Sequence, residues 1–365
     1  MNKDKINSFE FASIIPLIVS NSILGSGFLY LYNYSNSSAL ISMIIGIIIS
    51  VFPILLIFKV FNTYPNLTLS DKIKIIFPKW IYYIINTLFI IISLTLSALI
   101  FFRLIVFFHS QFTGSFSKYA IAFVLMIPSL YLTSKNIEVI TRFSTIITFI
   151  CIFVFLFDGL SLVSQVNLNN ILPLVTTNYK NIFTSSLVFF SLFSGPSFLL
   201  LIIPKNSIID KHKLKKYVII SYILSSVSLL IINIITLGTL GIDLIKIYTY
   251  PVYIVLKKIH VIDFINSIEN LTVLMWFFVL IFTSSLALFF SKSCLIEMLN
   301  INKRKIKVFI TLTMNLLIAF LPIILFSNKS FFDKPISAII PVIIYSFTYL
   351  LLIIVLITNK IKTKN

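Results

Sequence analysis

Charged residues are scarce in this sequence, and acidic residues are the scarcest of them. Only 11% of the 365 residues are charged, and 11 Asp and Glu stand against 29 Lys and Arg. Because a soluble domain has about a quarter charged residues, this chain has too little polar surface to stay in solution. With 59% hydrophobic residues and a mean hydropathy of +1.07, the composition predicts a membrane protein.

Cysteine and histidine are also rare. The two cysteines, Cys151 and Cys294, lie in or beside apolar segments, so no disulfide framework is expected. The three histidines, His109, His212 and His260, lie in or near loops, and none has a second histidine or an acid at ligand spacing. We therefore expect no metal site and no cofactor.

Motifs that would indicate an enzyme are missing as well. The sequence has no glycine-rich nucleotide loop, no nucleophile elbow and no paired acid site. We predict that the protein is not an enzyme.

Long apolar runs fill the chain instead, and each is near or above the roughly 20 residues that cross the hydrocarbon core. No small-residue cleavage site ends the first run, so it is expected to stay in the protein as a helix. There is no room for a soluble domain, and residues 1–365 are predicted to form a single transmembrane domain. The ten expected spans lie near 9–31, 37–58, 80–108, 117–134, 139–157, 181–203, 217–240, 264–290, 308–327 and 336–358.

The net charge of +18 does not indicate nucleic acid binding, because the positive residues gather on one side of these spans. With the N-terminus inside, 21 of the 29 lysines and arginines fall on the inner side. By the positive-inside rule this asymmetry predicts that both termini are cytoplasmic. The eight positive residues outside that group are Arg103, Lys118, Lys180, Lys246, Lys257, Lys258, Lys329 and Lys334.

Two of the spans are interrupted in the middle by small and polar residues. The first interruption runs from Ser20 to Gly27 and the second from Ser191 to Ser197. They fall in the first and sixth spans, which is the same place in two successive sets of five. A backbone that leaves the helix inside a bilayer must line a protected cavity, and paired breaks point to a small-solute site near the midplane.

Five is an odd number, so the second set of five spans enters the membrane from the opposite face. We therefore predict an all-α membrane protein of about ten transmembrane helices in a 5+5 inverted repeat, with helices 1 and 6 discontinuous. This LeuT-like symmetry is that of amino-acid/polyamine/organocation transporters. The first five-helix repeat is expected over 9–157 and the second over 181–358.

The first break is predicted to bind a ligand. Asn21, Ser22 and Ser26 offer donors and acceptors, while Gly25 and Gly27 permit backbone angles that a helix does not use. The second helical half would point free N–H groups into the cavity, and such an end favours an anion such as a carboxylate. The alternative is close packing of neighbouring helices on small residues.

The second break is predicted to complete the ligand site. Pro196 has no backbone N–H and disrupts the helix before it, and Gly195 adds freedom. Ser191 and Ser194 offer polar contacts, and Phe193 is placed to close over a ligand as a hinge and lid. The alternative is a simple proline kink.

The eighth span holds three candidate gating or pathway residues, Glu269, Trp276 and Thr283. They are seven apart and project from nearly one face of a helix, and ionisable groups at membrane depth mark pathways. Glu269 lies only about one and a half turns into the span, so it is alternatively an acid favoured by the helix dipole. Thr283 could meet the first helix at an ion site, or bond to its own helix.

Four other charged residues have structural interpretations. Arg103 falls near the outer end of the third span and is expected to snorkel to the interface, with pairing to Glu269 as the alternative. Glu138 and Arg142 are four apart and form a plausible helical ion pair. Glu10 is expected to serve the start of the first helix.

Several patches resemble the B subunit of spore germinant receptors, the endospore germination permease family. Tyr250-Pro251 precedes an amphipathic stretch, and Glu269 and Trp276 match a glutamate and a tryptophan of the family. Asn266 and Ser267 stand where the family commonly has an acid-arginine pair. The run Tyr64-Pro65-Asn66-Leu67-Thr68-Leu69 resembles its turn after the second span, and Ile23-Leu24-Gly25-Ser26-Gly27 resembles its small-residue break.

The resemblance implies a transporter fold used as a sensor in the spore inner membrane. Family members act with an A-type subunit and a lipoprotein C-type subunit, and they recognise small germinants, often amino acids. Two other functions stay open at this point. One is a proton- or sodium-coupled amino-acid transporter, and the other is an assembly scaffold with a vestigial pocket.

Overall fold

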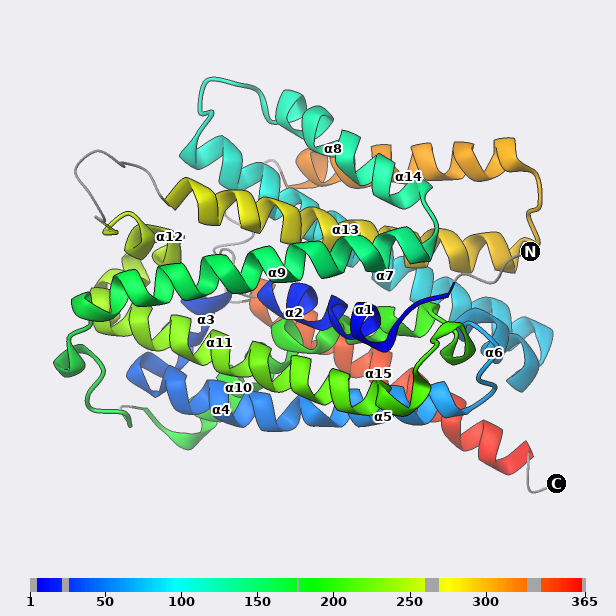
Figure 1. Cartoon of the computed structure of the whole chain (residues 1–365), viewed down its shortest axis with the longest axis horizontal. Helices are drawn as coiled ribbons and strands as arrows, with labels where there is room; N and C mark the ends of the chain where they lie inside the picture. Colours follow the sequence, from blue (N-terminus) through cyan, green and yellow to red (C-terminus); the bar gives the residue numbers. More distant parts are fainter. Residues whose placement is uncertain (1–4, 22–25, 176, 260–268, 327–335, 363–365) are drawn as a thin grey trace.

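The computed structural model describes residues 5–21, 26–175, 177–259, 269–326 and 336–362, the side chains of 26–28 and 336–338 excepted. The described residues form helices joined by short loops (Figure 1). The first two spans are each divided, into α1 (Ser8–Ala12), α2 (Ile14–Ser20) and α3 (Ser26–Ser35), and into α4 (Ala39–Ile49) and α5 (Val51–Asn62). The other long helices are α7 (Lys79–Gln111), α8 (Lys118–Ser134), α9 (Ile137–Leu162), α10 (Tyr179–Phe193), α11 (Lys211–Ile247), α13 (Glu269–Met298), α14 (Arg304–Leu325) and α15 (Ile336–Lys362).

Short elements complete the connections between these helices. Two short α-helices lie outside the spans, α6 (Leu69–Ile76) and α12 (Pro251–Leu256). The 3-10 helices are η1 (Asn36–Ser38), η2 (Val163–Gln165), η3 (Leu168–Asn170), η4 (Gly195–Ile202) and η5 (Lys205–Ser207).

The ten predicted spans match the helices of the structure. Within the described residues, eight helical stretches have the length and apolar composition to cross a membrane. Two shorter apolar helices, Ser8–Ser20 and Lys118–Ser134, stand at the predicted first and fourth spans. The chain is therefore a multi-pass membrane protein, in which helices satisfy the backbone groups that lipid cannot.

Two spans differ in extent from the prediction. The seventh was expected over 217–240; α11 begins earlier, at Lys211, and is kinked at Gly241, beyond which a further helical segment runs to Ile247. The φ of Gly241 is 72°, a left-handed conformation that glycine adopts without steric cost. The eighth was expected from 264, but residues 260–268 lie outside the described part and α13 is described from Glu269.

Buried hydroxyl and amide groups join α7 to α13 at the centre of the bundle. The Ser93 and Ser291 hydroxyl oxygens lie 2.6 Å apart, and those of Ser97 and Ser284 lie 2.9 Å apart. Near the other end of the pair, the Asn86 amide donates to the Cys294 carbonyl at 3.0 Å. Small residues let membrane helices approach closely, and their hydroxyls bond across the contact. These bonds fix α7, and with it the residues of its outer half.

The C-terminal end of α15 lies at the same end of the bundle as the loops that join α8 to α9 and α13 to α14 (Figure 1). We call this the inner end, because its loops carry the lysine-rich segments that the positive-inside rule predicts to be cytoplasmic. Helix α12 lies at the opposite, outer end (Figure 1).

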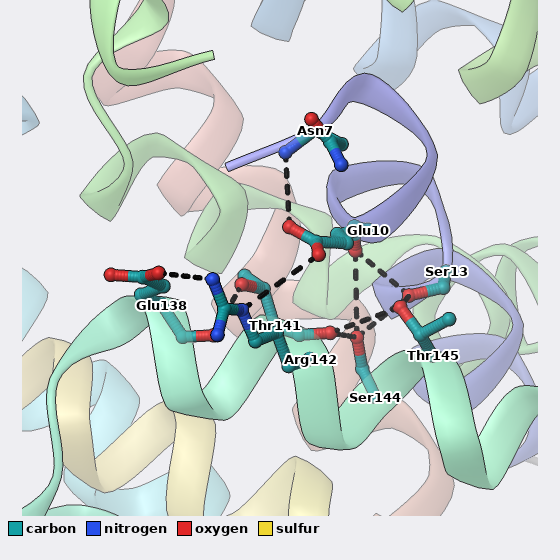
Figure 2. Close-up of polar contacts among 8 residues, drawn as sticks. All are labelled: Asn7, Glu10, Ser13, Glu138, Thr141, Arg142, Ser144 and Thr145. Atoms are coloured by element: carbon teal, nitrogen blue, oxygen red, sulfur yellow. Dashed lines mark hydrogen bonds and ion pairs between the residues drawn. The ribbon is translucent and has the colours of Figure 1, made fainter. Parts of the chain in front are cut away.

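Polar contacts tie α1 and α2 to α9 at the inner end (Figure 2). The predicted ion pair of Glu138 with Arg142 is confirmed, with Oε1 and Nη2 2.5 Å apart, and Arg142 Nε lies 3.9 Å from Glu10 Oε1. Glu10 also accepts a bond from the Asn7 backbone N–H at 3.0 Å, so it serves the helix start as expected. Beside these charges, the Ser13 hydroxyl lies 2.7 Å from that of Ser144.

Candidate functional site

The first helix is interrupted where the small and polar residues predicted a break. Helix α2 ends at Ser20, and α3 begins at Ser26. Two predicted ligand residues, Ser22 and Gly25, lie outside the described residues. Ser26 and Gly27 begin α3, where only their backbone is described.

Asn21 is the described polar residue at this first break. Its side chain is buried, and its Oδ1 atom has no hydrogen-bond partner in the described part of the chain. Burying a polar group without a partner costs free energy. An orphaned acceptor beside a cavity therefore indicates a place for a ligand or water.

The sixth helix is also discontinuous. Helix α10 ends at Phe193, and after Ser194 the chain continues as the 3-10 helix η4. The break leaves carbonyl groups without their α-helical donors, which lipid cannot replace. The Tyr349 hydroxyl of α15 donates to the carbonyls of Ser194 and Gly195, at 2.8 Å and 3.0 Å. A side chain from another span thus stabilises the break.

Removing that hydroxyl is expected to destabilise the protein. Tyr349→Phe leaves two buried carbonyls without this donor, a loss of about 1–3 kcal/mol. We expect a lower midpoint of thermal unfolding in detergent. Tyr131→Phe is the matched control, because Tyr131 is 59% exposed on the bundle surface. Equal midpoints for the two variants would contradict this role for Tyr349.

A cavity of about 40 Å³ lies between the two breaks. Its walls come from the end of α2, the outer half of α7, the end of α10, the start of η4, and α15. By the usual measure a water needs roughly 10–15 Å³ of such space, so this cavity accepts a few waters or a very small solute. Its polar and aromatic walls are Asn21, Arg103, Ser191 and Tyr345, and Pro196 of the second break also lines it.

Arg103 is the unexpected member of this cavity. Arg103 is partly exposed and lines this cavity, and its Nε has no hydrogen-bond partner in the described structure. The ion pairs of the described residues are those of Arg142 with Glu10 and Glu138, so no acid pairs with Arg103 there. A place on the cavity wall was not expected for this residue. A charge at this depth is costly unless something pairs with it.

Not every predicted residue of the second break lines the cavity. Ser191 and Pro196 do. Phe193 is fully buried elsewhere, with its ring centroid 5.2 Å from Phe189 and 5.4 Å from Tyr222. The structure therefore puts Phe193 in the packing between α10 and α11 and not over the cavity. From this position Phe193 does not cover the cavity, so it does not suit the role of a lid over a ligand that we expected from the sequence.

Gly195 and Ser194 shape the break without lining the cavity. The Ser194 hydroxyl donates back to the Phe190 carbonyl at 3.3 Å. A β carbon on Gly195 would lie 2.4 Å from the Tyr345 ring. No real β carbon fits at that distance, so glycine permits η4 to rest against the wall of the cavity.

Trp276 belongs to an aromatic cluster around Phe107. The Phe107 ring lies 6.0 Å from Trp276, 5.0 Å from Tyr250 and 5.6 Å from Tyr253, measured between centroids. Phe107 is one helical turn outward of Arg103 on α7, so the cluster joins α7, α12 and α13 on the outer side of the cavity. Edge-to-face rings of this kind pack favourably and exclude water.

Thr283 and Glu269 lie apart from the cavity. The Thr283 hydroxyl donates to Val279 in its own helix at 2.8 Å and lies 3.3 Å from the Leu17 carbonyl of α2. The bond to Val279 is the alternative expected for Thr283, and the contact with Leu17 joins the eighth span to the first. Glu269 stands at the described start of α13. Burial raises the pKa of Tyr253, and the nearby charge of Glu269 raises that pKa further. Glu269 forms no ion pair with Arg103 within the described residues.

A larger cavity of about 310 Å³ lies on the other side of the first helix, among α2, α9, α11, α12 and α13. Its walls are mostly apolar, and Trp276 contributes to them. Asp158 provides the one carboxyl group of this lining, and its Oδ2 accepts a bond from Thr272 at 2.9 Å. Asp158 Oδ1 has no hydrogen-bond partner in the described part of the chain, so this cavity also presents one unsatisfied acceptor, within walls that are otherwise mostly apolar.

Three comparisons relate this geometry to known proteins. A family model described as spore germination protein matches residues 8–332. Among solved structures, the chain is similar to Mhp1, a transporter of the nucleobase-cation-symport-1 family, in a closed conformation with bromovinylhydantoin bound. The TM-score is 0.62 at 12% identity, over 96% of this chain and 79% of Mhp1. This likeness confirms the predicted LeuT-like transporter fold. No curated protein matches the chain.

Proposed function

The chain belongs to the spore germination protein family, and from that membership we propose that it is the membrane-embedded sensor of a spore germinant receptor. It binds a small germinant, an amino acid, between the broken first and sixth helices. Ligand binding biases an outward-open state against an occluded one, and the receptor reports that change as a germination signal. A ligand shifts such an equilibrium only by its differential affinity for the two states.

The cavity at Arg103 is the observation that carries this proposal. An amino acid brings a carboxylate, and Arg103 offers a guanidinium that has no acid partner in the described residues. Charge-assisted bonds between arginine and carboxylate are the strong ones, and two parallel bonds also fix orientation. The orphaned Asn21 oxygen suits the ligand ammonium group, and the cavity of about 40 Å³ widens in the outward-open state to admit the whole ligand.

The aromatic cluster around Phe107 supports access from the outside. It lies directly outward of Arg103 and joins α12 to α7 and α13. Separation of these rings would open a path to the cavity, and their closure would exclude water and strengthen the pairing of Arg103 with a carboxylate. The proposal includes the A-type and lipoprotein C-type subunits as partners and the spore inner membrane as location, with both termini cytoplasmic.

A germination assay tests the proposal directly. Spores that lack this gene are exposed to a panel of the common amino acids, each also supplied as its methyl ester. We expect the deletion to remove the response to at least one free amino acid, and the ester of that amino acid to be inactive on wild-type spores. Normal germination of the deletion strain on the whole panel would refute the receptor function.

Coupled amino-acid transport is the second candidate function. It is favoured by the contact of Thr283 with the Leu17 carbonyl at 3.3 Å and by the fold shared with the transporter Mhp1. The two functions differ in what the isolated chain does in a membrane. A receptor subunit is expected to bind ligand without sustained flux. Uptake of labelled amino acids into proteoliposomes, driven by a proton or sodium gradient, would favour the transporter.

A further inference from the structure

A second candidate binding site lies at the inner end of the bundle, away from the two broken helices. There, α5 and the start of α11 border a groove of about 440 Å³. Four lysines line it: Lys59 of α5, Lys205 of η5, and Lys211 and Lys215 of α11. We propose that this groove binds an anionic phospholipid of the inner leaflet, with the phosphate among the lysines and an acyl chain along α5.

The lysines have no acid to neutralise them in the described part of the chain. Lys205 donates to the Asn62 amide oxygen at 2.6 Å, and Lys211 donates to that of Asn206. Asp210 precedes α11, yet the ion pairs of the described residues involve neither it nor these lysines. Four like charges around one groove repel one another, and an anion relieves that repulsion.

The lining of the groove changes from apolar to basic toward the inner end, which is the order of acyl chain and headgroup in an inner-leaflet lipid. Phe52, Leu55, Lys59 and Asn62 follow one face of α5, which ends at the inner end. Phe52 and Leu55 are each 51% exposed on the side toward the membrane centre. A tail therefore meets the apolar residues where the headgroup meets Lys59. A free phosphate would leave that apolar half unused.

Helix α11 forms the other wall of the groove and also places lysines at the inner end. Lys211, Leu214 and Lys215 lie three and four residues apart and share one face. Lys211 is also the first residue of α11, so the positive end of the helix dipole lies at the groove. Basic pockets between membrane helices on the cytoplasmic side are suited to anionic headgroups.

Two lysine pairs on α11 provide the test. The purified full chain is titrated with phosphatidylglycerol, and separately with phosphatidylcholine of the same acyl chains, and bound lipid is counted by native mass spectrometry. The variant Lys211→Gln/Lys215→Gln removes two lysines of the groove. The control Lys213→Gln/Lys216→Gln makes the same charge change on the same helix, at exposed lysines that do not line the groove.

We expect the native chain to prefer phosphatidylglycerol, and the groove variant to bind it roughly twenty-five-fold more weakly, since each lysine is worth about fivefold. The control should keep the native affinity. Equal affinities for the two double variants would overturn the site. Glycerol phosphate is added as a competitor at the same concentration. If it displaces the lipid as well as unlabelled phosphatidylglycerol does, the groove binds a soluble anion and the lipid proposal is wrong.

Leu55→Asn tests the apolar half independently of charge. It places an amide where the acyl chain is proposed to lie, on a side chain that is already 51% exposed. We expect weaker binding of phosphatidylglycerol and unchanged binding of glycerol phosphate. No change in lipid binding would contradict the placement of the tail along α5.

Discussion

Replacing Arg103 with glutamine is expected to lower the sensitivity to a carboxylate germinant at least thirtyfold. Truncating one partner of a buried, hydrogen-bonded charge pair costs about 2–5 kcal/mol, and each 1.4 kcal/mol is about tenfold in affinity. The measurement is the germinant concentration that gives half-maximal germination, for every amino acid that the native spores sense.

The arginine at the inner end provides the matched control. Arg142→Gln removes the same charge from a side chain that is 62% exposed and pairs with Glu138 and Glu10. Its half-maximal germinant concentration should stay within a few-fold of the native value. Arg103→Lys keeps the charge but loses the planar fork, so an intermediate loss is expected. A full response of Arg103→Gln spores that contain normal amounts of the protein would show that the carboxylate binds elsewhere.

Replacing Gly195 with valine is expected to abolish the response altogether. A β carbon there would lie 2.4–2.7 Å from three atoms of the Tyr345 ring. Overpacking of this kind costs about 1–3 kcal/mol or more and moves the backbone. Because Tyr345 lines the cavity, the displacement also changes the space for the ligand. Germination on the sensed amino acids and the amount of protein in spore membranes are both measured.

A second glycine and a compensating change separate site damage from general instability. Gly159→Val is the control, because a β carbon there meets nothing within 4 Å. It should be tolerated apart from a small effect on helix propensity. The double variant Gly195→Ala/Tyr345→Ala removes the clashing ring and should regain the protein amount that Gly195→Ala loses. Failure of this rescue, with additive losses, would mean that the two residues do not interact.

The two breaks could be predicted from the sequence because their causes are local. Pro196 has no N–H and cannot continue the α10 hydrogen bonds, and α10 indeed ends at Phe193. Asn21 stands at the end of α2, at the start of the run of small and polar residues that predicted the first break. Local chemistry also explains Glu10, which bonds to a backbone N–H three residues before it.

Arg103 could not be assigned from the sequence because its surroundings come from distant segments. The predicted span ended at 108, which placed Arg103 near the lipid interface. Helix α7 instead reaches Gln111, and Tyr250, Tyr253 and Trp276 cover the outer turn of α7 through Phe107. Tertiary packing also explains the position of Phe193, whose ring contacts Phe189 and Tyr222 and does not line the cavity. The sequence did hold one indication of a buried site: Arg103 lies in an apolar span and has no acidic residue one helical turn away.

The hydroxyls between α2 and α9 allow the two helices to part at low cost. Ser13 donates to the Glu10 carbonyl at 2.8 Å, and Ser144 and Thr145 donate to the Thr141 carbonyl at 2.6 Å and 3.2 Å (Figure 2). Each of these hydroxyls therefore keeps an acceptor in its own segment after separation, and no donor is stranded in lipid. One further bond, from the Thr148 hydroxyl of α9 to the Ser13 carbonyl at 2.8 Å, crosses the contact and would be lost if the helices parted. The first helix is therefore held to α9 mainly by hydroxyls that their own segments can satisfy, whereas the carbonyls of the second break depend on the Tyr349 hydroxyl of another span.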